Sequence, residues 1–241
     1  MKSMLNVDFR RMFTMRLLYI MLGICLVTPI LILVMTSGFG GDGEQMFSSV
    51  WPIIGTTGSS TGGMDIMAMC NIDLVYFGVV ILACLFVSED FKSGYAKNLF
   101  TVRAKKTHYV ISKILVCFAG GALMIAAFFV GAMLDGVFAG LPFELGAVNT
   151  GNIVLCMLSK IFVVGIFVAI PVAASAFAKQ KTWAAILGAC IVCTFLFPMV
   201  PMMTPLNATA INASLCLVGG LLLCIGLGSV GSMFLKKRDI L

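Results

Sequence analysis

Long apolar runs separated by short polar stretches dominate the pattern of this chain. Each run has about the 20 predominantly apolar residues that a helix needs to cross a bilayer, where backbone polar groups must bond within their own segment. The runs predict six membrane-spanning helices, at about residues 17–36, 72–87, 109–134, 153–178, 183–200 and 212–235. The expected fold is an all-α integral membrane protein with residues 1–241 as a single transmembrane domain.

The fifth apolar run ends in a proline-rich stretch. Pro198, Pro201 and Pro205 follow one another at short intervals at its expected outer end. Proline has no backbone N–H to donate and its ring clashes with the preceding turn. We therefore expect the fifth helix to break there.

The segment before the first run is amphipathic. Its apolar residues recur at helical spacing, at Leu5, Phe9, Met12 and Phe13, and basic residues occupy other positions. This pattern predicts a helix over residues 1–16 that lies in the membrane interface. Such a helix either anchors the chain and sets its orientation or transmits motion from a cytoplasmic partner, and the pattern leaves both open.

Charge is scarce and unevenly placed. Only 11% of residues are charged, about half the share in a soluble domain. With the N-terminus inside, fifteen of the sixteen Lys and Arg residues fall in cytoplasmic segments, and Lys160 is the exception. This bias predicts that both termini are cytoplasmic. It also accounts for the net charge of +6, since basic inner segments attract anionic lipid headgroups, and no nucleic-acid partner is expected.

Motifs for catalysis and for cofactor binding are absent from the sequence. No glycine-rich stretch leads into Gly-Lys-Ser/Thr, so a P-loop for ATP is missing, and no zinc-ligand spacing occurs. Eight of the nine cysteines fall inside apolar runs, where cysteine behaves as a small hydrophobe. We expect no catalytic, cofactor-binding or metal-binding residue, and a chain that is not itself an enzyme.

Three ionisable residues fall near or inside the outer ends of the runs. A charge near mid-bilayer costs about 2.5–3.5 kcal/mol unless it is solvated or paired. The cheaper arrangement starts the fourth span at Ile161 and places Lys160 at the outer rim, and Asp73 and Asp135 are likewise expected to reach the surface. The alternative, in which these three residues line a substrate path, stays open.

Two runs carry small residues at every fourth position. They are Gly165, Ala169 and Ala173 in the fourth run, and Gly220, Cys224, Gly228 and Ser232 in the sixth. Small residues let membrane helices approach closely. The stripes predict helix packing within the chain or a seam between two copies.

The polar stretch between the second and third runs is the most informative segment. It reads Ser88-Glu89-Asp90-Phe91-Lys92-Ser93-Gly94-Tyr95-Ala96-Lys97-Asn98, and the basic tract 103–106 and Ser112-Lys113 follow. With the six-span layout, this order resembles the permease subunits of ABC-2-type transporters. It is most similar to small bacterial permeases linked to export of, or immunity against, lantibiotics and other antimicrobial peptides.

The resemblance implies a cytoplasmic coupling helix seated in a groove of a separate ATPase chain. The residues it assigns to coupling are Glu89, Asp90, Phe91, Lys92, Gly94, Tyr95, Lys97 and Asn98. On one continuous helix, Phe91 and Tyr95 would share a face and supply aromatic anchors. Two permease chains, identical or paralogous, would pair with two ATPase subunits, and ATP would be used by the partner.

The expected function is export of an antimicrobial peptide or another hydrophobic or amphipathic compound across a bacterial plasma membrane. A different class also fits the sequence: an ATP-independent channel, or a membrane-anchor subunit of a larger complex. The absence of an ATPase partner would favour that alternative.

Overall fold

The computed structural model describes residues 2–37, 49–55, 71–101, 106–144, 149–178 and 181–237. Residues 103–105 of the basic tract lie outside these ranges. Within them, every regular element is helical. The helices are α1 (Lys2–Thr14), α2 (Arg16–Ser37), α3 (Trp51–Ile54), the 3-10 turn η2 (Ile72–Leu74), α5 (Val75–Lys92), α6 (Tyr95–Thr101), α7 (Lys106–Ala139), α8 (Thr150–Ala178), α9 (Thr182–Leu196), the 3-10 turn η3 (Phe197–Met199), α10 (Val200–Met203) and α11 (Ala210–Lys237).

Among the residues that the structure describes, six helical segments are long and apolar enough to cross a membrane. They are Arg16–Met35, Ile72–Lys92, Lys106–Ala139, Thr150–Ala178, Thr182–Met203 and Ala210–Leu235. The predicted all-α fold with six spans is confirmed. The second, third and fourth helices extend beyond the predicted bounds because each continues through polar residues that the hydropathy pattern assigned to loops.

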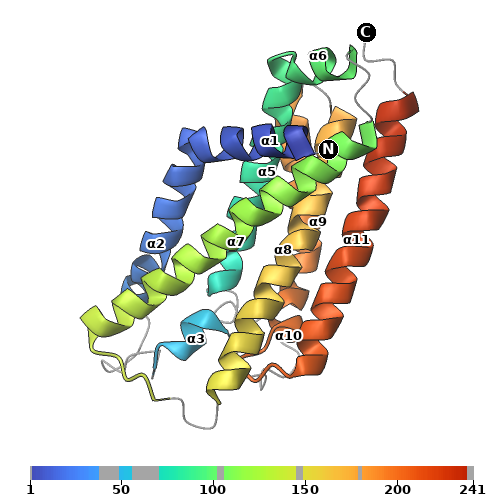
Figure 1. Ribbon diagram of the computed structural model, residues 1–241. Helices are drawn as coiled ribbons and strands as arrows, with labels where there is room; N and C mark the ends of the chain where they lie inside the picture. The colour runs from blue at the N-terminus through green and yellow to red at the C-terminus, as the bar shows by residue number, and fades with distance from the viewer. Residues whose placement is uncertain are drawn as a thin grey trace.

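The bundle is built around α8, which packs against α5, α7, α9 and α11. Helix α7 runs diagonally across it, and α1 crosses the end of the bundle at a steep angle to α2 (Figure 1). At 1.5 Å per residue, the 34 residues of α7 span about 50 Å, more than a bilayer core of about 30 Å. A tilted course accommodates this excess length.

Two glycines permit close backbone contact between helices. A Cβ at Gly131 of α7 would meet the carbonyl oxygen of Leu26 on α2, and a Cβ at Gly220 of α11 would lie 2.8 Å from the carbonyl oxygen of Phe162 on α8. One turn along, the Cys224 thiol donates to the Gly165 carbonyl across 3.2 Å. The part of the sixth-span stripe formed by Gly220 and Cys224 therefore packs against the fourth span within the chain.

The fifth span breaks where the prolines predict. Helix α9 ends at Leu196, a 3-10 turn containing Pro198 follows, and the short α10 ends at Met203. This confirmed break brings Thr204 into the interior, where its side chain is fully buried.

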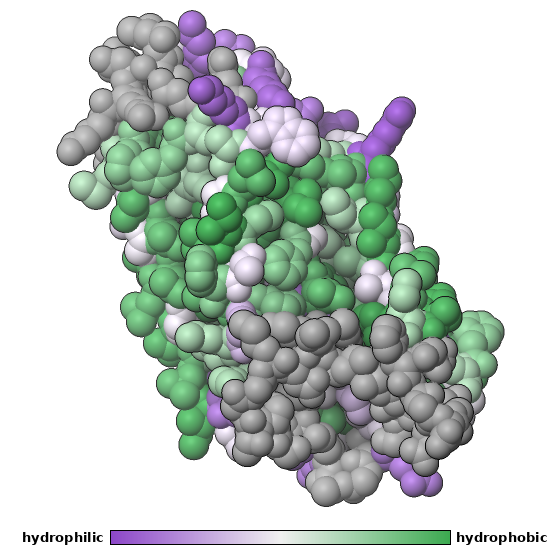
Figure 2. Space-filling model, turned by 180° about the vertical axis from the view of Figure 1, so that it is seen from behind, coloured by the Kyte–Doolittle hydropathy of each residue, from purple (hydrophilic) through white to green (hydrophobic). Residues whose placement is uncertain are grey.

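The outer surface of the bundle is apolar. In Figure 2, green hydrophobic side chains cover the middle of the visible face, and purple hydrophilic side chains gather at the end where α1 and α6 lie. Large apolar side chains such as Ile225 and Phe195 are well exposed on the bundle. A band of this kind suits contact with lipid.

Candidate functional site

The predicted coupling segment is divided between two helices. Helix α5 ends at Lys92, Gly94 has a φ of 73°, and α6 begins at Tyr95. A left-handed glycine directly after a helix end is a common way to stop a helix. The prediction of one continuous helix with Phe91 and Tyr95 on a shared face was therefore wrong.

The residues of this segment point in two directions. Glu89, Lys92, Lys97 and Asn98 are exposed. In contrast, Asp90 is fully buried, and the half-buried Phe91 ring packs edge-on against Tyr109, with ring centroids 6.3 Å apart. The segment thus has a polar outer side and an inner side that is bonded to the rest of the chain.

The buried side belongs to a group of charged and hydroxyl side chains that we name the inner ionic cluster. Its members are Asp8 and Arg11 of α1, Asp90 of α5, and Tyr109, Ser112 and Lys113 of α7. Lys113 lies at the centre and is fully buried. Its Nζ is 2.8 Å from Asp8 Oδ1 and 2.6 Å from Asp90 Oδ2, and it lies 4.3 Å from the centroid of the Phe86 ring.

Both carboxylates of the inner ionic cluster have several partners. The Ser112 hydroxyl donates to Asp8 Oδ2 across 2.6 Å, and the Tyr109 hydroxyl donates to Asp90 Oδ2 across 2.9 Å. Arg11 Nη1 lies 2.7 Å from Asp90 Oδ1, as an ion pair whose angles do not make an aligned hydrogen bond. Two acids and two bases make the cluster neutral, which is the condition for burying charges in a low-dielectric interior.

Arg11 links the cluster to α6. Its Cζ lies over the Tyr95 ring, 4.3 Å from the centroid. Partial burial acts to lower the pKa of Arg11, but the attraction of Asp90, with smaller contributions from Tyr95 and Asp8, raises that pKa above its ordinary value. Arg11 therefore stays charged, and it holds α1 against both helices of the coupling segment.

Sequence reasoning missed Asp8 and Tyr109. The signal for Asp8 was present, because it falls three residues after Leu5 and four before Met12, on the apolar side of α1. An acid on the buried side of an amphipathic helix requires a basic partner. Lys113, which the sequence pointed to only as part of a motif, is that partner.

A second buried ion pair, the outer ion pair, joins Lys160 of α8 to Asp73 of η2. Lys160 Nζ donates to Asp73 Oδ1 across 2.6 Å and to the Thr204 hydroxyl across 3.0 Å. The Tyr76 hydroxyl donates to the Lys160 carbonyl across 2.8 Å, and its ring stacks on Phe167. The turn η2 and the helices α5 and α8 therefore meet at this ion pair.

The outer ion pair corrects two expectations. Helix α8 begins at Thr150, ten residues before Lys160, and both Lys160 and Asp73 are fully buried. The predictions that Lys160 sits at the outer rim and that Asp73 reaches the surface were wrong. Each charge provides the partner that makes burial of the other tolerable, and hydropathy along the chain does not reveal such pairs.

Two acids in this part of the bundle keep a carboxylate oxygen that receives no hydrogen bond. They are Asp73 and Asp135, whose Oδ2 atoms are both buried without a donor among the described residues. Asp135 is only 6% exposed, so the expectation that it reaches the surface was also wrong. These oxygens can accept a donor from a group that enters the bundle.

The described residues show no group of three or more His, Cys, Asp or Glu side chains arranged to hold a metal ion. The cysteines of the described ranges are free thiols, most of them buried. The contacts described at the two charged sites are ion pairs and hydrogen bonds.

A comparison with protein families matches residues 10–196 to the model described as ABC-2 family transporter protein. No curated protein and no solved structure matches the chain. The match covers four of the six spans in full and the fifth as far as Leu196, together with the inner ionic cluster except for Asp8 and the Asp73 and Lys160 side chains of the outer ion pair. The chain therefore belongs to the ABC-2 transporter family, whose members work with ABC ATPase partners, and it is a membrane component of an ABC transporter.

Proposed function

We propose that this permease is one of two membrane subunits, identical or paralogous, of an ATP-driven exporter whose ATP is bound and hydrolysed on separate ATPase chains. The two-sided coupling segment carries the proposal. Its exposed side offers Glu89, Lys92 and Lys97 to a docking protein, and its buried side is bonded into the bundle through Asp90.

A push on this segment would move several helices together. Asp90 is bonded to Arg11 of α1 and to Lys113 of α7, and α1 leads through Met15 into α2. Charges buried without water exchange partners only at high cost, so these helices would move as a rigid unit. ATP binding on the partner would then reshape a path between the two permeases, in a two-state rigid-body change.

The outer ion pair is proposed to form part of the substrate path, closed in this conformation. Asp73 and Lys160 are buried, and Thr204 ties them to the segment after the broken fifth span. Opening the path there would separate the pair or offer its charges to the cargo, and Asp135 would add a second acceptor. We propose an antimicrobial peptide or another hydrophobic or amphipathic compound as that cargo, because it can match both the apolar spans and the charged pair.

We propose a bacterial plasma membrane as the location, with both termini cytoplasmic. The segregation of Lys and Arg supports this orientation. The coupling segment, α1 and the end of α11 also lie at one end of the bundle (Figure 1). One face of the protein would then meet the ATPase and the anionic inner leaflet.

Co-purification from native membranes tests the proposal. The tagged full-length chain is expected to bring down an ABC ATPase, and the charge reversals Glu89→Lys and Lys97→Glu are expected to release it without changing the melting temperature of the permease. Lys181→Glu is the matched control, because Lys181 is an exposed lysine outside the coupling segment. Retention of the ATPase by both reversals would overturn the assigned docking side. Intact permease without any ATPase would support the channel or anchor instead.

A further inference from the structure

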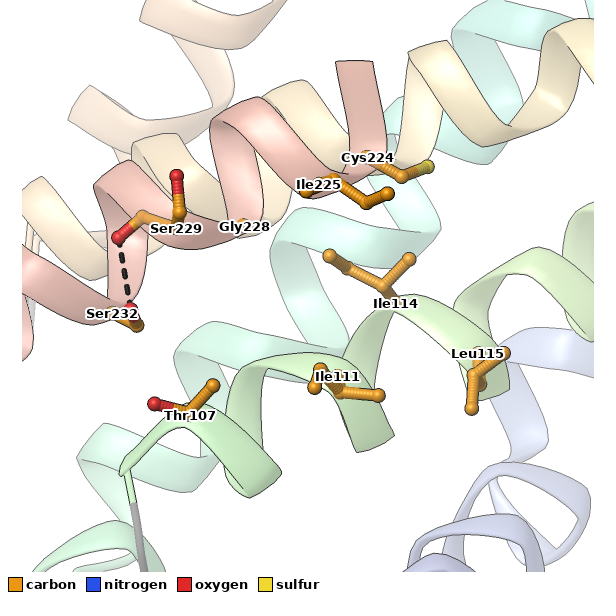
Figure 3. Close-up of a pocket in the computed structure, with 9 residues that line it drawn as sticks. All are labelled: Thr107, Ile111, Ile114, Leu115, Cys224, Ile225, Gly228, Ser229 and Ser232. Atoms are coloured by element: carbon orange, nitrogen blue, oxygen red, sulfur yellow. Dashed lines mark hydrogen bonds between the residues drawn. The ribbon is translucent and has the colours of Figure 1, made fainter. Parts of the chain in front are cut away.

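A cleft of about 390 Å³ lies between the first half of α7 and the last half of α11 (Figure 3). One end is apolar and is lined by Ile111 and Ile114 of α7 and Ile225 of α11. Ile111 is 38% exposed and Ile225 is 68% exposed, so this part of the cleft opens to the surroundings of the bundle. A hydrocarbon chain fits the chemistry of this end.

The other end of the cleft carries hydroxyl groups. Figure 3 shows Thr107, Ser229 and Ser232 together at this end, away from the isoleucines. The Ser232 hydroxyl donates to the Ser229 carbonyl across 2.8 Å, and the Ser229 hydroxyl donates to the Gly226 carbonyl across 2.7 Å. Hydroxyl oxygens that donate in this way keep lone pairs for a further donor, and they can also rotate toward an acceptor.

Positive charge flanks the hydroxyl end. Lys106 begins α7 next to Thr107, and its Nζ donates to the Leu235 carbonyl near the end of α11 across 2.6 Å. This bond joins the two helices just beyond the cleft. Lys106 therefore brings a positive charge to this end of the helix pair.

We propose that this cleft binds one anionic phospholipid, with an acyl chain along the isoleucines and the phosphate near Lys106 and the hydroxyl groups. The proposal rests on the orientation given under the proposed function, which places this end in the inner leaflet. An anionic headgroup near a membrane-surface lysine gains about 1 kcal/mol per charge, or about fivefold in affinity. A zwitterionic lipid with the same acyl chains lacks that gain in affinity.

A bound lipid would act on the helix that holds the inner ionic cluster. Thr107 and Ile111 line the cleft from one side of α7, and Tyr109 and Lys113 extend into the cluster from another. The lipid would fill the space between α7 and α11 and stabilise α7 in the position that bonds Asp90. Anything that binds the folded state alone also raises its melting temperature.

Native mass spectrometry of the full-length permease in mild detergent tests this inference, with phosphatidylglycerol and phosphatidylcholine of identical acyl chains as probes. We expect one phosphatidylglycerol to bind about fivefold more tightly than phosphatidylcholine. Ser229→Phe fills the hydroxyl end of the cleft and is expected to weaken both lipids about tenfold, because its ring takes the space of the glycerol and the first acyl carbons, equivalent to about two buried methylenes. Lys106→Gln is expected to remove the preference for phosphatidylglycerol, so that the two lipids bind with equal affinity.

Two matched controls keep the test specific. Ser214 is also an exposed α11 serine that donates to the carbonyl three residues back, so Ser214→Phe is expected to bind lipid like the native chain, and so is Lys181→Gln. Equal binding of both lipids, or equal effects of Ser229→Phe and Ser214→Phe, would overturn the proposal in favour of an unspecific lipid shell. Permease dimers that bind no lipid and that Ser229→Phe dissociates would overturn it in favour of a second copy. Because lipid binding is measured on the permease alone, its failure leaves the ATPase test unaffected.

Discussion

The inner ionic cluster and the outer ion pair use the same chemistry near opposite ends of α5, and they differ in how many partners share each charge. Asp90 and Asp73 are 17 residues apart, or about 25 Å along a helix. Asp90 forms ion pairs with Arg11 and Lys113 and accepts a hydrogen bond from Tyr109, whereas Asp73 is paired with one lysine, and its second carboxylate oxygen has neither an ion pair nor a hydrogen bond within the described residues.

This difference indicates two roles for buried charge in one bundle. In the inner ionic cluster, loss of one contact leaves each carboxylate another partner, so a single broken contact does not separate the helices. In the outer ion pair, separation of two atoms frees both charges at once. The first arrangement suits a rigid joint, and the second suits a contact that opens and closes.

The largest effect is expected from removal of the central cation of the inner ionic cluster. Lys113→Met leaves Asp8 and Asp90 buried with Arg11 as the one remaining base of the cluster, and breaking such a buried arrangement costs about 3–5 kcal/mol. A large fall in the melting temperature of the detergent-purified protein is the expected result. Lys97→Met, at an exposed position of α6, is the control and should melt like the native chain. Equal melting temperatures of the two variants would show that the inner ionic cluster does not hold the helices together.

A double substitution sharpens the comparison. Lys160→Met alone is expected to cost about 3 kcal/mol, because it leaves Asp73 buried without a base. Adding Asp73→Asn should restore most of that loss, since no charge then remains at the site. The corresponding inner pair, Lys113→Met with Asp90→Asn, should not recover, because Asp8 and Arg11 both lose their ion-pair partners.

Thermal unfolding of the four single and two double variants measures this contrast. If both double variants recover their stability, the two sites hold their charges in the same way, each as a simple ion pair. Recovery in neither would mean that the outer ion pair has further partners.

The smallest expected effect is the loss of stability when either of two buried tyrosines loses its hydroxyl group. Tyr109→Phe removes a hydrogen bond to the Asp90 carboxylate and is expected to cost about 1.5–3 kcal/mol. Tyr76→Phe removes a bond to the neutral Lys160 carbonyl and is expected to cost about 0.5–1.5 kcal/mol. Both rings remain, so packing is preserved. Unfolding curves that show the reverse order would contradict the assignment of the stronger charge environment to the inner ionic cluster.

The sequence was a good guide to elements and a poor one to partners. The six spans and the proline break after Leu196 are confirmed, because helix length and hydropathy are properties of neighbouring residues. The segment assigned to coupling was expected to be one continuous helix, and this was wrong, since a single left-handed residue at Gly94 divides it. The rim position of Lys160 was wrong for a different reason, because its partner lies 87 residues away in the chain.

The sequence by itself determined that this chain belongs in a membrane, and its order of polar residues indicated an ABC-2 permease. Burial in lipid demands long apolar helices, and that demand is legible in any window of about 20 residues. Only the tertiary structure decided that Asp8 meets Lys113, that Asp73 meets Lys160, and that the aromatic residues of the coupling segment face their own chain. A buried charge is tolerable only beside its counter-ion, and helix packing decides which counter-ion that is.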